Sequence, residues 1–178
     1  TSYPEQYLYH LFVSILGDDR VVSRDKSAIG LELDIYIPSL NLAIEYGSWY
    51  WHQDKFDNDR LKNRKCDSKG IALITIIDNC PENFSDSMFW CYTQKIERCD
   101  ETMRSLIHRL LLACGLASYY NPIDFEKIES MARNSSHKKT TEDFIRDLLK
   151  TNIKLKILGD YCGVHEPIQT ECLECGYI

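Results

Sequence analysis

Two carboxylates in the first third of the chain, Asp34 and Glu45, are the residues whose types and spacing best suit a chemical role. Each lies in a short segment where apolar and polar residues alternate, which is the period-two pattern of a half-buried strand. Residues 38–41, Pro-Ser-Leu-Asn, separate the two segments and fit a hairpin loop. If Ile37 pairs with Leu42, the antiparallel register places Asp34 directly opposite Glu45.

Opposed carboxylates on one sheet face repel each other, so this pair needs a compensating cation or a raised pKa on one member. A hard divalent cation, Mg²⁺ or Mn²⁺, is the natural partner because it prefers carboxylate oxygens. The alternative is two solvated carboxylates on the wet face of a sheet. The pair alone does not separate these interpretations, and the residues around it favour the metal.

The elements that position this pair are predicted to form one α/β domain with a mixed sheet. The chain opens with a helix capped by Ser2, in which Glu5 stands at the reciprocal capping-box position. After the pair, Lys55–Lys69 has the pattern of an amphipathic helix, and Ile71–Asp78 is a near-continuous β-branched run typical of a buried strand. Strand, helix and strand within this length make a crossover unit, so the third strand should lie parallel to the second.

Downstream, the pattern predicts further helices and a small C-terminal module. Helices are expected over Asp86–Arg98 and Asp100–Cys114, followed by a less regular stretch up to Arg133. A polar, basic segment then reads as a linker, and Thr140 caps a short helix over Glu142–Lys150. The predicted organisation is a domain over residues 1–133, a linker over 134–140 and a module over 141–178.

Composition bounds the class of protein. The 178 residues, 44% hydrophobic and 27% charged, fit a soluble globular domain with a small appendage, and no apolar run approaches the ~20 residues of a membrane span. The net charge of −6 argues against a generally basic nucleic-acid binder, yet Arg60–Lys69 holds five basic residues against one aspartate. Most of the eight cysteines fall in periodic segments, and no secretory signal opens the chain, so reduced thiols and a cytoplasmic location are expected.

The order and spacing of these features over residues 1 to about 80 resemble the PD-(D/E)XK nuclease superfamily, in its very-short-patch-repair-like branch that includes phage homing endonucleases. The matching segments are Ser2–Glu5, Leu31–Pro38, Leu42–Gly47, Tyr50–His52, Asp59–Lys62 and Gly70–Ile74. The resemblance implies a restriction-endonuclease-like core, a mixed sheet flanked by helices. It also implies Mg²⁺-dependent hydrolysis of DNA phosphodiesters, by an endonuclease or a nickase, in a bacterial or phage-infected cytosol.

The resemblance also assigns roles to individual residues. The catalytic residues it implies are Glu5, Asp34, Glu45, His52, Asp59 and Lys62, with Asp34 and Glu45 holding Mg²⁺ or Mn²⁺. The lysine expected two positions after the glutamate is replaced by Gly47, so the general base is either Lys62 or His52. Lys62→Ala is expected to slow cleavage and leave Mg²⁺ affinity little changed, because a cationic side chain cannot ligate a cation.

Each of these assignments has a purely structural alternative. Glu5 needs no role beyond capping, Asp59 fits a helix cap equally well, and His52 lies among aromatic residues that could simply pack around it. DNA contacts are expected from Arg60, Arg64, Lys65 and Lys69, and the alternative is a solvated helix face.

The last residues resemble the first half of a zinc ribbon, since Cys172-x-x-Cys175-Gly176 has the spacing of a metal knuckle. A tetrahedral zinc site needs four ligands. Cys162 and His165 are one way to complete the set; we expect instead that the other pair lies beyond Ile178 and that this chain binds no zinc.

Two hypotheses of different class therefore stand. The first is a metal-dependent DNA endonuclease, and the second is a non-catalytic DNA-binding or adaptor module that keeps the nuclease-like fold. The acidic pair favours the enzyme, whereas the acidic net charge and Gly47 favour the adaptor. The sequence leaves open a homodimer or larger complex.

Overall fold

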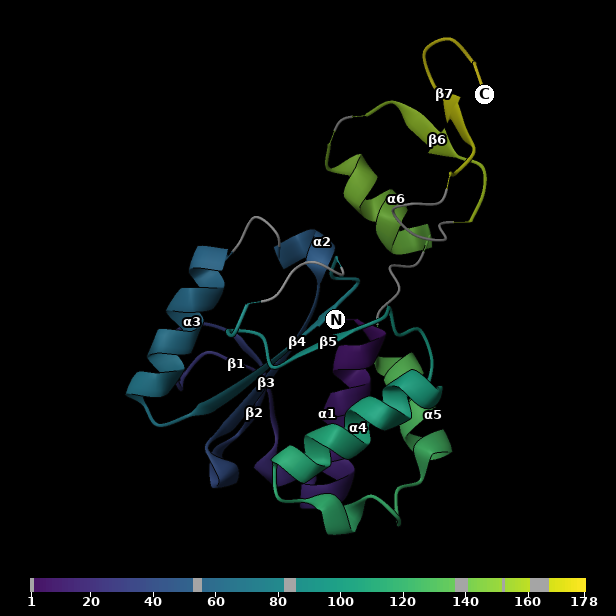
Figure 1. The fold of residues 1–178 in the computed structure, drawn as a ribbon. Coiled ribbons are helices and arrows are strands. Elements are labelled where there is room, and N and C mark those ends of the chain that lie inside the picture. The colour runs from purple at the N-terminus through teal and green to yellow at the C-terminus, as the bar shows by residue number, and fades with distance from the viewer. Residues whose placement is uncertain (1, 53–55, 82–85, 137–140, 152, 161–166) are drawn as a thin grey trace. The chain divides into compact units, whose positions relative to one another are not determined.

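The computed structural model describes residues 2–52, 56–81, 86–136, 141–151, 153–160 and 167–178. The chain divides into two compact units, Thr1–Ser136 and His137–Ile178 (Figure 1). The predicted linker lies at this division: its first residues, Asn134 and Ser135, belong to a helix of the first unit, and residues 137–140 lie outside the described residues.

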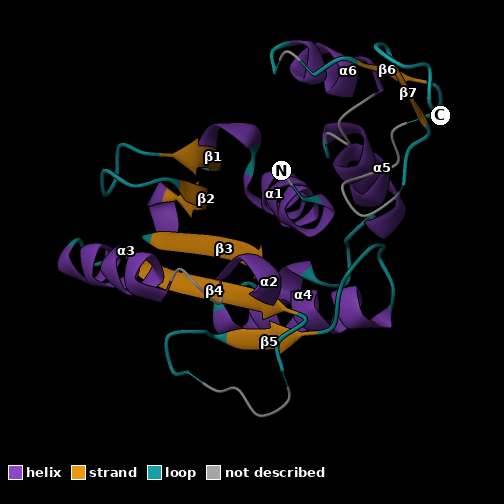
Figure 2. Ribbon diagram, turned by 90° about the horizontal axis from the view of Figure 1, so that it is seen from above, coloured by secondary structure: helices purple, strands orange, loops and turns teal. Residues whose placement is uncertain are grey.

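The first unit is a mixed α/β fold, as predicted. Over the described residues its strands form a five-stranded sheet in the order β1-β2-β3-β4-β5, which Figure 2 shows from one edge to the other. β1, β2 and β3 are antiparallel neighbours, and β3, β4 and β5 are parallel. The strands are β1 (Val22–Asp25), β2 (Leu33–Ile37), β3 (Leu42–Ser48), β4 (Ala72–Asp78) and β5 (Cys91–Thr93).

The central hairpin has the predicted register, with Ile37 opposite Leu42 and Ile35 opposite Ile44. A short 3₁₀ turn over Pro38–Leu40 makes the connection, and Asn41 closes it in the left-handed region at φ 47°. This register is favoured because it places the apolar side chains of both strands in the cores, and a slip by one residue would move each of them to the opposite face of the sheet.

Helices cover both faces of the sheet. α1 (Tyr3–Leu16), α4 (Glu101–Ala113) and α5 (Phe125–Ser135) bury their apolar faces in the larger core, against residues of β2, β3 and β4 (Figure 1). α3 (Phe56–Ser68) covers a smaller core around Cys66, Leu33 and Ala43. The predicted capping box of α1 is confirmed: the backbone N–H of Glu5 donates to the Ser2 hydroxyl, and the backbone N–H of Ser2 donates to the Glu5 carboxylate.

The crossover from β3 to β4 also follows the prediction. After a single-turn helix, α2 (Trp49–His52), the chain continues through α3 into β4, which runs parallel to β3 and pairs Glu45 with Thr75. In such a crossover, the helix that connects two parallel strands packs against one face of the sheet. This arrangement brings α3 over the two carboxylates.

Two predicted segments were wrong. The helix expected over Asp86–Arg98 is absent: Cys91–Thr93 forms strand β5, and Cys91 lies opposite Ile76 of β4. Conversely, the stretch Tyr119–Arg133 is more regular than expected, because Asp124 accepts a hydrogen bond from the backbone N–H of Lys127 and caps the eleven-residue helix α5.

The second unit holds one helix and one hairpin in its described part. α6 (Thr141–Leu149) lies close to the predicted helix, and its predicted cap Thr140 lies outside the described residues. β6 (Leu155–Ile157) pairs antiparallel with β7 (Thr170–Cys172). Among the described residues of the whole chain, none of the helices has the length and apolarity needed to cross a membrane.

Candidate metal and active site

Asp34 and Glu45 meet across the hairpin, one step beyond the Ile35–Ile44 pair. The backbone N–H of Asp34 donates to Glu45 Oε1 at 3.0 Å, and the backbone N–H of Tyr46 donates to Asp34 Oδ2 at 3.2 Å. Each carboxylate is thus hydrogen-bonded to the backbone of the opposite strand. This reciprocal arrangement ties each side chain to the hairpin backbone.

Lys62 of α3 completes a compact charged group with these carboxylates. Its Nζ lies 2.5 Å from Glu45 Oε2. The side chains of Lys62 and Glu45 are only 20% and 9% exposed, so water screens this ion pair little. Lys62 is placed by the helix, whose next turn carries the fully buried Cys66 of the smaller core.

The protonation of the site follows from its burial. Burial raises the pKa of the Glu45 carboxyl to about 7; the negative charge of Asp34 adds to this rise, and Lys62 opposes it. Burial also raises the pKa of Glu5 at the start of α1, with the charge of Asp34 as the second cause. The predicted entry glutamate therefore lies within electrostatic reach of Asp34.

The raised pKa of Glu45 predicts how divalent-cation binding depends on pH. A carboxyl that holds its proton up to about pH 7 must release it to ligate a metal, so affinity should fall as pH falls through 7. With one proton competing, we expect Mn²⁺ to bind about tenfold more weakly at pH 6 than at pH 8. Isothermal titration calorimetry without DNA measures this, with Glu45→Gln as the control. Equal affinities at pH 6 and pH 8 would contradict it.

The structure describes fewer contacts for the other predicted catalytic residues, Asp59 and His52. Asp59 lies on α3 one turn before Lys62 and is half-buried, and its backbone carbonyl accepts a hydrogen bond from the Asn63 amide at 3.5 Å. His52 belongs to α2, but its side chain lies outside the described residues.

The four predicted DNA-contacting residues separate around α3. Lys65 donates from Nζ to the backbone carbonyl of Ile29 at 3.1 Å and so holds the loop before β2. Lys69 is exposed just after the helix. Arg60 and Arg64 lie on the opposite flank from Lys62, since two positions in a helix turn the side chain by about 200°.

Arg60 and Arg64 line a groove of about 330 Å³ between α3 and the segment before β5. The other residues that line it are Asn63, Asp86, Ser87 and Met88. Arg60 contacts Asp86 and Asp57 at 3.6 and 3.8 Å, distances of weak, solvent-screened pairs. The groove therefore presents guanidinium groups on the flank of α3 that faces away from the carboxylate pair.

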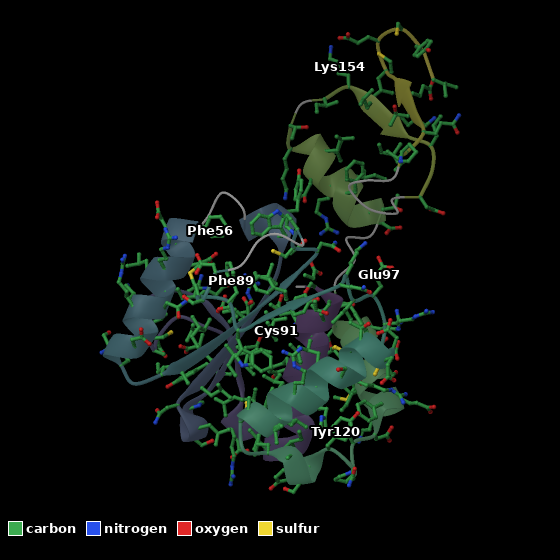
Figure 3. All side chains as sticks on the ribbon, in the orientation of Figure 1. Phe56, Phe89, Cys91, Glu97, Tyr120 and Lys154 are labelled. Atoms are coloured by element: carbon green, nitrogen blue, oxygen red, sulfur yellow. The ribbon has the colours of Figure 1, made fainter. Side chains whose placement is uncertain are left out.

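Two features of this region were not singled out from the sequence. Asp78, the last residue of β4, is buried and accepts a hydrogen bond from the Tyr46 hydroxyl at 3.2 Å. A row of aromatic rings runs beside it from Trp49 through Phe56 and Phe89 to Tyr92, with centroids about 6 Å apart; Figure 3 labels Phe56 and Phe89. The sequence signal for Asp78 was that it is the single charged residue of the strand Ala72–Asp78.

Cys172 and Cys175 lie in a tight turn near the end of the chain. Backbone N–H groups of Glu174 and Cys175 donate to the Cys172 thiol and lower its pKa, and Gly176 takes a positive φ of 72° to close the turn. The two residues considered as further ligands, Cys162 and His165, lie outside the described residues. Among the residues that the structure describes, no three His, Cys, Asp or Glu side chains lie close enough to hold a metal ion together.

No family model matches this chain, and neither the curated proteins nor the solved structures contain a match. The function is therefore argued from the site itself.

Proposed function

We propose that the first unit is a metal-dependent DNA endonuclease, a phosphodiesterase of the PD-(D/E)XK type acting in the cytoplasm. The observation that carries this proposal is the carboxylate pair on adjacent strands, fixed by reciprocal backbone hydrogen bonds and already facing a cation, Lys62. Two carboxylates held this close are costly without such a counter-charge. The element order, with a hairpin and then a helix leading to a parallel strand, is the order that this nuclease resemblance implies.

The residues present fit Mg²⁺ or Mn²⁺. Both are hard cations that prefer oxygen ligands, and Mg²⁺ is typically held by one or two carboxylates together with water and substrate phosphate oxygens. Asp34 and Glu45 supply two such carboxylates, and the ammonium at Glu45 Oε2 marks where positive charge is stabilised. When bound, the cation would polarise the scissile phosphate and acidify a water molecule.

The protein's own side chains would carry the rest of the reaction. Asp34 and Glu45 would hold the cation, because two carboxylates by themselves repel a phosphate. Lys62 supplies a point charge beside them that can bind a phosphate oxygen or orient the attacking water. The guanidinium groups of Arg60 and Arg64, on the far flank of α3, suit the phosphates of flanking nucleotides rather than the scissile one.

A specific observation favours the second candidate function, a non-catalytic DNA-binding or adaptor module. The Lys62–Glu45 ion pair can neutralise Glu45 without any metal. In addition, Gly47 stands where the nuclease pattern has lysine, and the net charge is −6. Under this alternative the same three residues would stabilise the fold and bind no divalent cation.

Incubation with supercoiled plasmid DNA tests the two candidates. The endonuclease should convert the plasmid to nicked or linear product with Mg²⁺ or Mn²⁺, and EDTA should abolish the conversion. The ratio of nicked to linear product separates a nickase from an enzyme that cuts both strands. DNA binding without cleavage under every metal condition would instead support the adaptor.

A further inference from the structure

The Lys62–Glu45 contact differs in kind from the surface ion pairs of this protein. The pair Lys95–Glu97 has the same 2.5 Å separation, but its side chains are 62% and 70% exposed, and such a pair contributes little to stability. Lys62 and Glu45 are largely withdrawn from water. Separating them without a replacement charge would leave a buried carboxylate uncompensated, which is strongly unfavourable.

The two oxygens of Glu45 are held by different donors. Oε1 accepts the backbone N–H of Asp34, a bond that belongs to the hairpin itself, and Oε2 accepts the Lys62 ammonium. A metal ion that ligates Glu45 through Oε2 takes the position that the Lys62 ammonium occupies and leaves the hairpin contact at Oε1 in place. Because a divalent cation and an ammonium at one oxygen repel each other, they compete for this position.

We propose that Lys62 is a built-in counter-cation that a divalent metal ion displaces from Glu45 Oε2, and that the displaced ammonium then binds a phosphate oxygen of the nucleic acid. This inference rests on the proposed function, because it takes Asp34 and Glu45 as the metal ligands. It assigns Lys62 a role in the order in which metal and DNA bind. Metal binding releases the Lys62 ammonium, which then binds the phosphate of the substrate.

The displacement links the two ligands thermodynamically. Metal ions bound alone separate Lys62 from Glu45, which opposes their binding. A phosphate that takes the released ammonium removes this penalty, so metal and DNA should each tighten the binding of the other by the same factor. The site would then bind a divalent cation weakly without substrate and more tightly with it.

Mn²⁺ titration of Lys62→Gln without DNA tests the competition directly. At pH 8.5, where the carboxylates are ionised, the variant should bind Mn²⁺ about 5–150-fold more tightly than the parent, the range of typical coupling between sites. Glutamine keeps a hydrogen-bond donor for Glu45 but carries no charge. Lys65→Gln is the matched control, because it removes the same charge from the same helix but its Nζ contacts the Ile29 carbonyl; its Mn²⁺ affinity should stay within about twofold of the parent.

The outcomes separate this inference from the proposed function. If the parent binds Mn²⁺ and cleaves DNA but Lys62→Gln binds the ion no more tightly, the competition is wrong and the nuclease stands. If neither protein binds Mn²⁺ and neither cleaves, both proposals fall. Should Lys62→Gln not fold, as judged by circular dichroism, Lys62→Arg gives the test: its larger planar cation keeps the charge, so Mn²⁺ affinity should stay near the parent value, and a gain above fivefold would refute the competition.

A DNA-binding measurement tests the second half of the inference. With Ca²⁺ as a probe that occupies oxygen sites, fluorescence anisotropy should show the parent binding a DNA duplex at least about fivefold more tightly than it does in EDTA. In Lys62→Gln this enhancement should shrink, since no ammonium is released. An enhancement of equal size in both proteins would show that the phosphate gains nothing from Lys62.

Discussion

Replacing Glu45 with glutamine should lower the rate of plasmid cleavage at least about 10²–10³-fold, the usual cost of removing one electrostatic group from an active site. The amide retains an oxygen that can accept the backbone N–H of Asp34, so the hairpin contact survives. What is lost is the negative charge that holds a cation at Oε2. Asp34→Asn should have a similar effect, because its carboxylate supplies the second charge of the pair. Gel analysis of nicked and linear product at saturating Mg²⁺ measures both rates.

Stability measurements show whether a lower cleavage rate comes from the lost carboxylate or from unfolding of the variant. Asp34→Asn removes one charge from a repulsive pair, so its thermal unfolding without metal should occur at a temperature close to that of the parent. Glu45→Gln also removes the buried partner of Lys62, so it should unfold at a lower temperature and stay folded at the temperature of the cleavage assay. Asp67→Asn serves as the control, since this exposed carboxylate lies near the end of α3 and should leave cleavage unchanged. If Glu45→Gln cleaves DNA as fast as the parent, Glu45 is not part of a metal site and the adaptor candidate takes its place.

The hairpin that carries this pair was predictable because local and tertiary signals agree there. Alternation sets which side chains face the core, and the loop over 38–41 sets which residues are opposite each other. The cross-strand position of Asp34 and Glu45 follows from these two facts alone. The partner of Glu45 did not follow, since no local pattern specifies which residue of α3 reaches β3.

The basic run Arg60–Lys69 shows most clearly what the sequence alone does not predict. In the sequence its five cations form one group, but a helix distributes consecutive residues about 100° apart, so Lys62 faces Glu45 while Arg60 and Arg64 line a groove on the opposite flank. A helical projection would have separated the two sets. It would not have revealed that Lys62 pairs with Glu45. For this reason the sequence alone predicts an unchanged Mg²⁺ affinity for Lys62→Ala, whereas the proposed competition predicts a gain in Mn²⁺ affinity for Lys62→Gln.

The strand β5 was missed for a different reason. Its three residues are too few to establish alternation, and the surrounding segment carries enough apolar residues for a helical pattern. The pairing of Cys91 with Ile76, and of Thr93 with Asp78, makes the segment a strand. Contacts between residues more than ten positions apart are what single-sequence patterns do not contain.

Two adjacent leucines of α4 give a test of the core that is independent of the site. Leu111 is fully buried in the larger core, whereas Leu112 is 62% exposed on the same helix. Leu111→Ala removes buried methyl groups and leaves a cavity in the larger core, which typically costs about 2–5 kcal/mol of unfolding free energy. Such a loss is a large fraction of the ~5–15 kcal/mol that stabilises a typical domain.

Leu112→Ala makes the same chemical change one position later, so helix propensity is altered equally and burial alone distinguishes the two variants. We expect its unfolding free energy to stay within about 0.5 kcal/mol of the parent, as for surface substitutions in general. Urea unfolding followed by circular dichroism measures both values.

Leu111 lies in the core around α1, α4 and α5, whereas Lys62 and Cys66 lie on α3 over the other face of the sheet. Leu111→Ala should therefore reduce stability and leave Mn²⁺ affinity unchanged at temperatures where the protein is folded. Equal destabilisation by the two leucine substitutions would mean that α4 does not face the sheet through Leu111, and the larger core would have to be rebuilt around a different face of that helix.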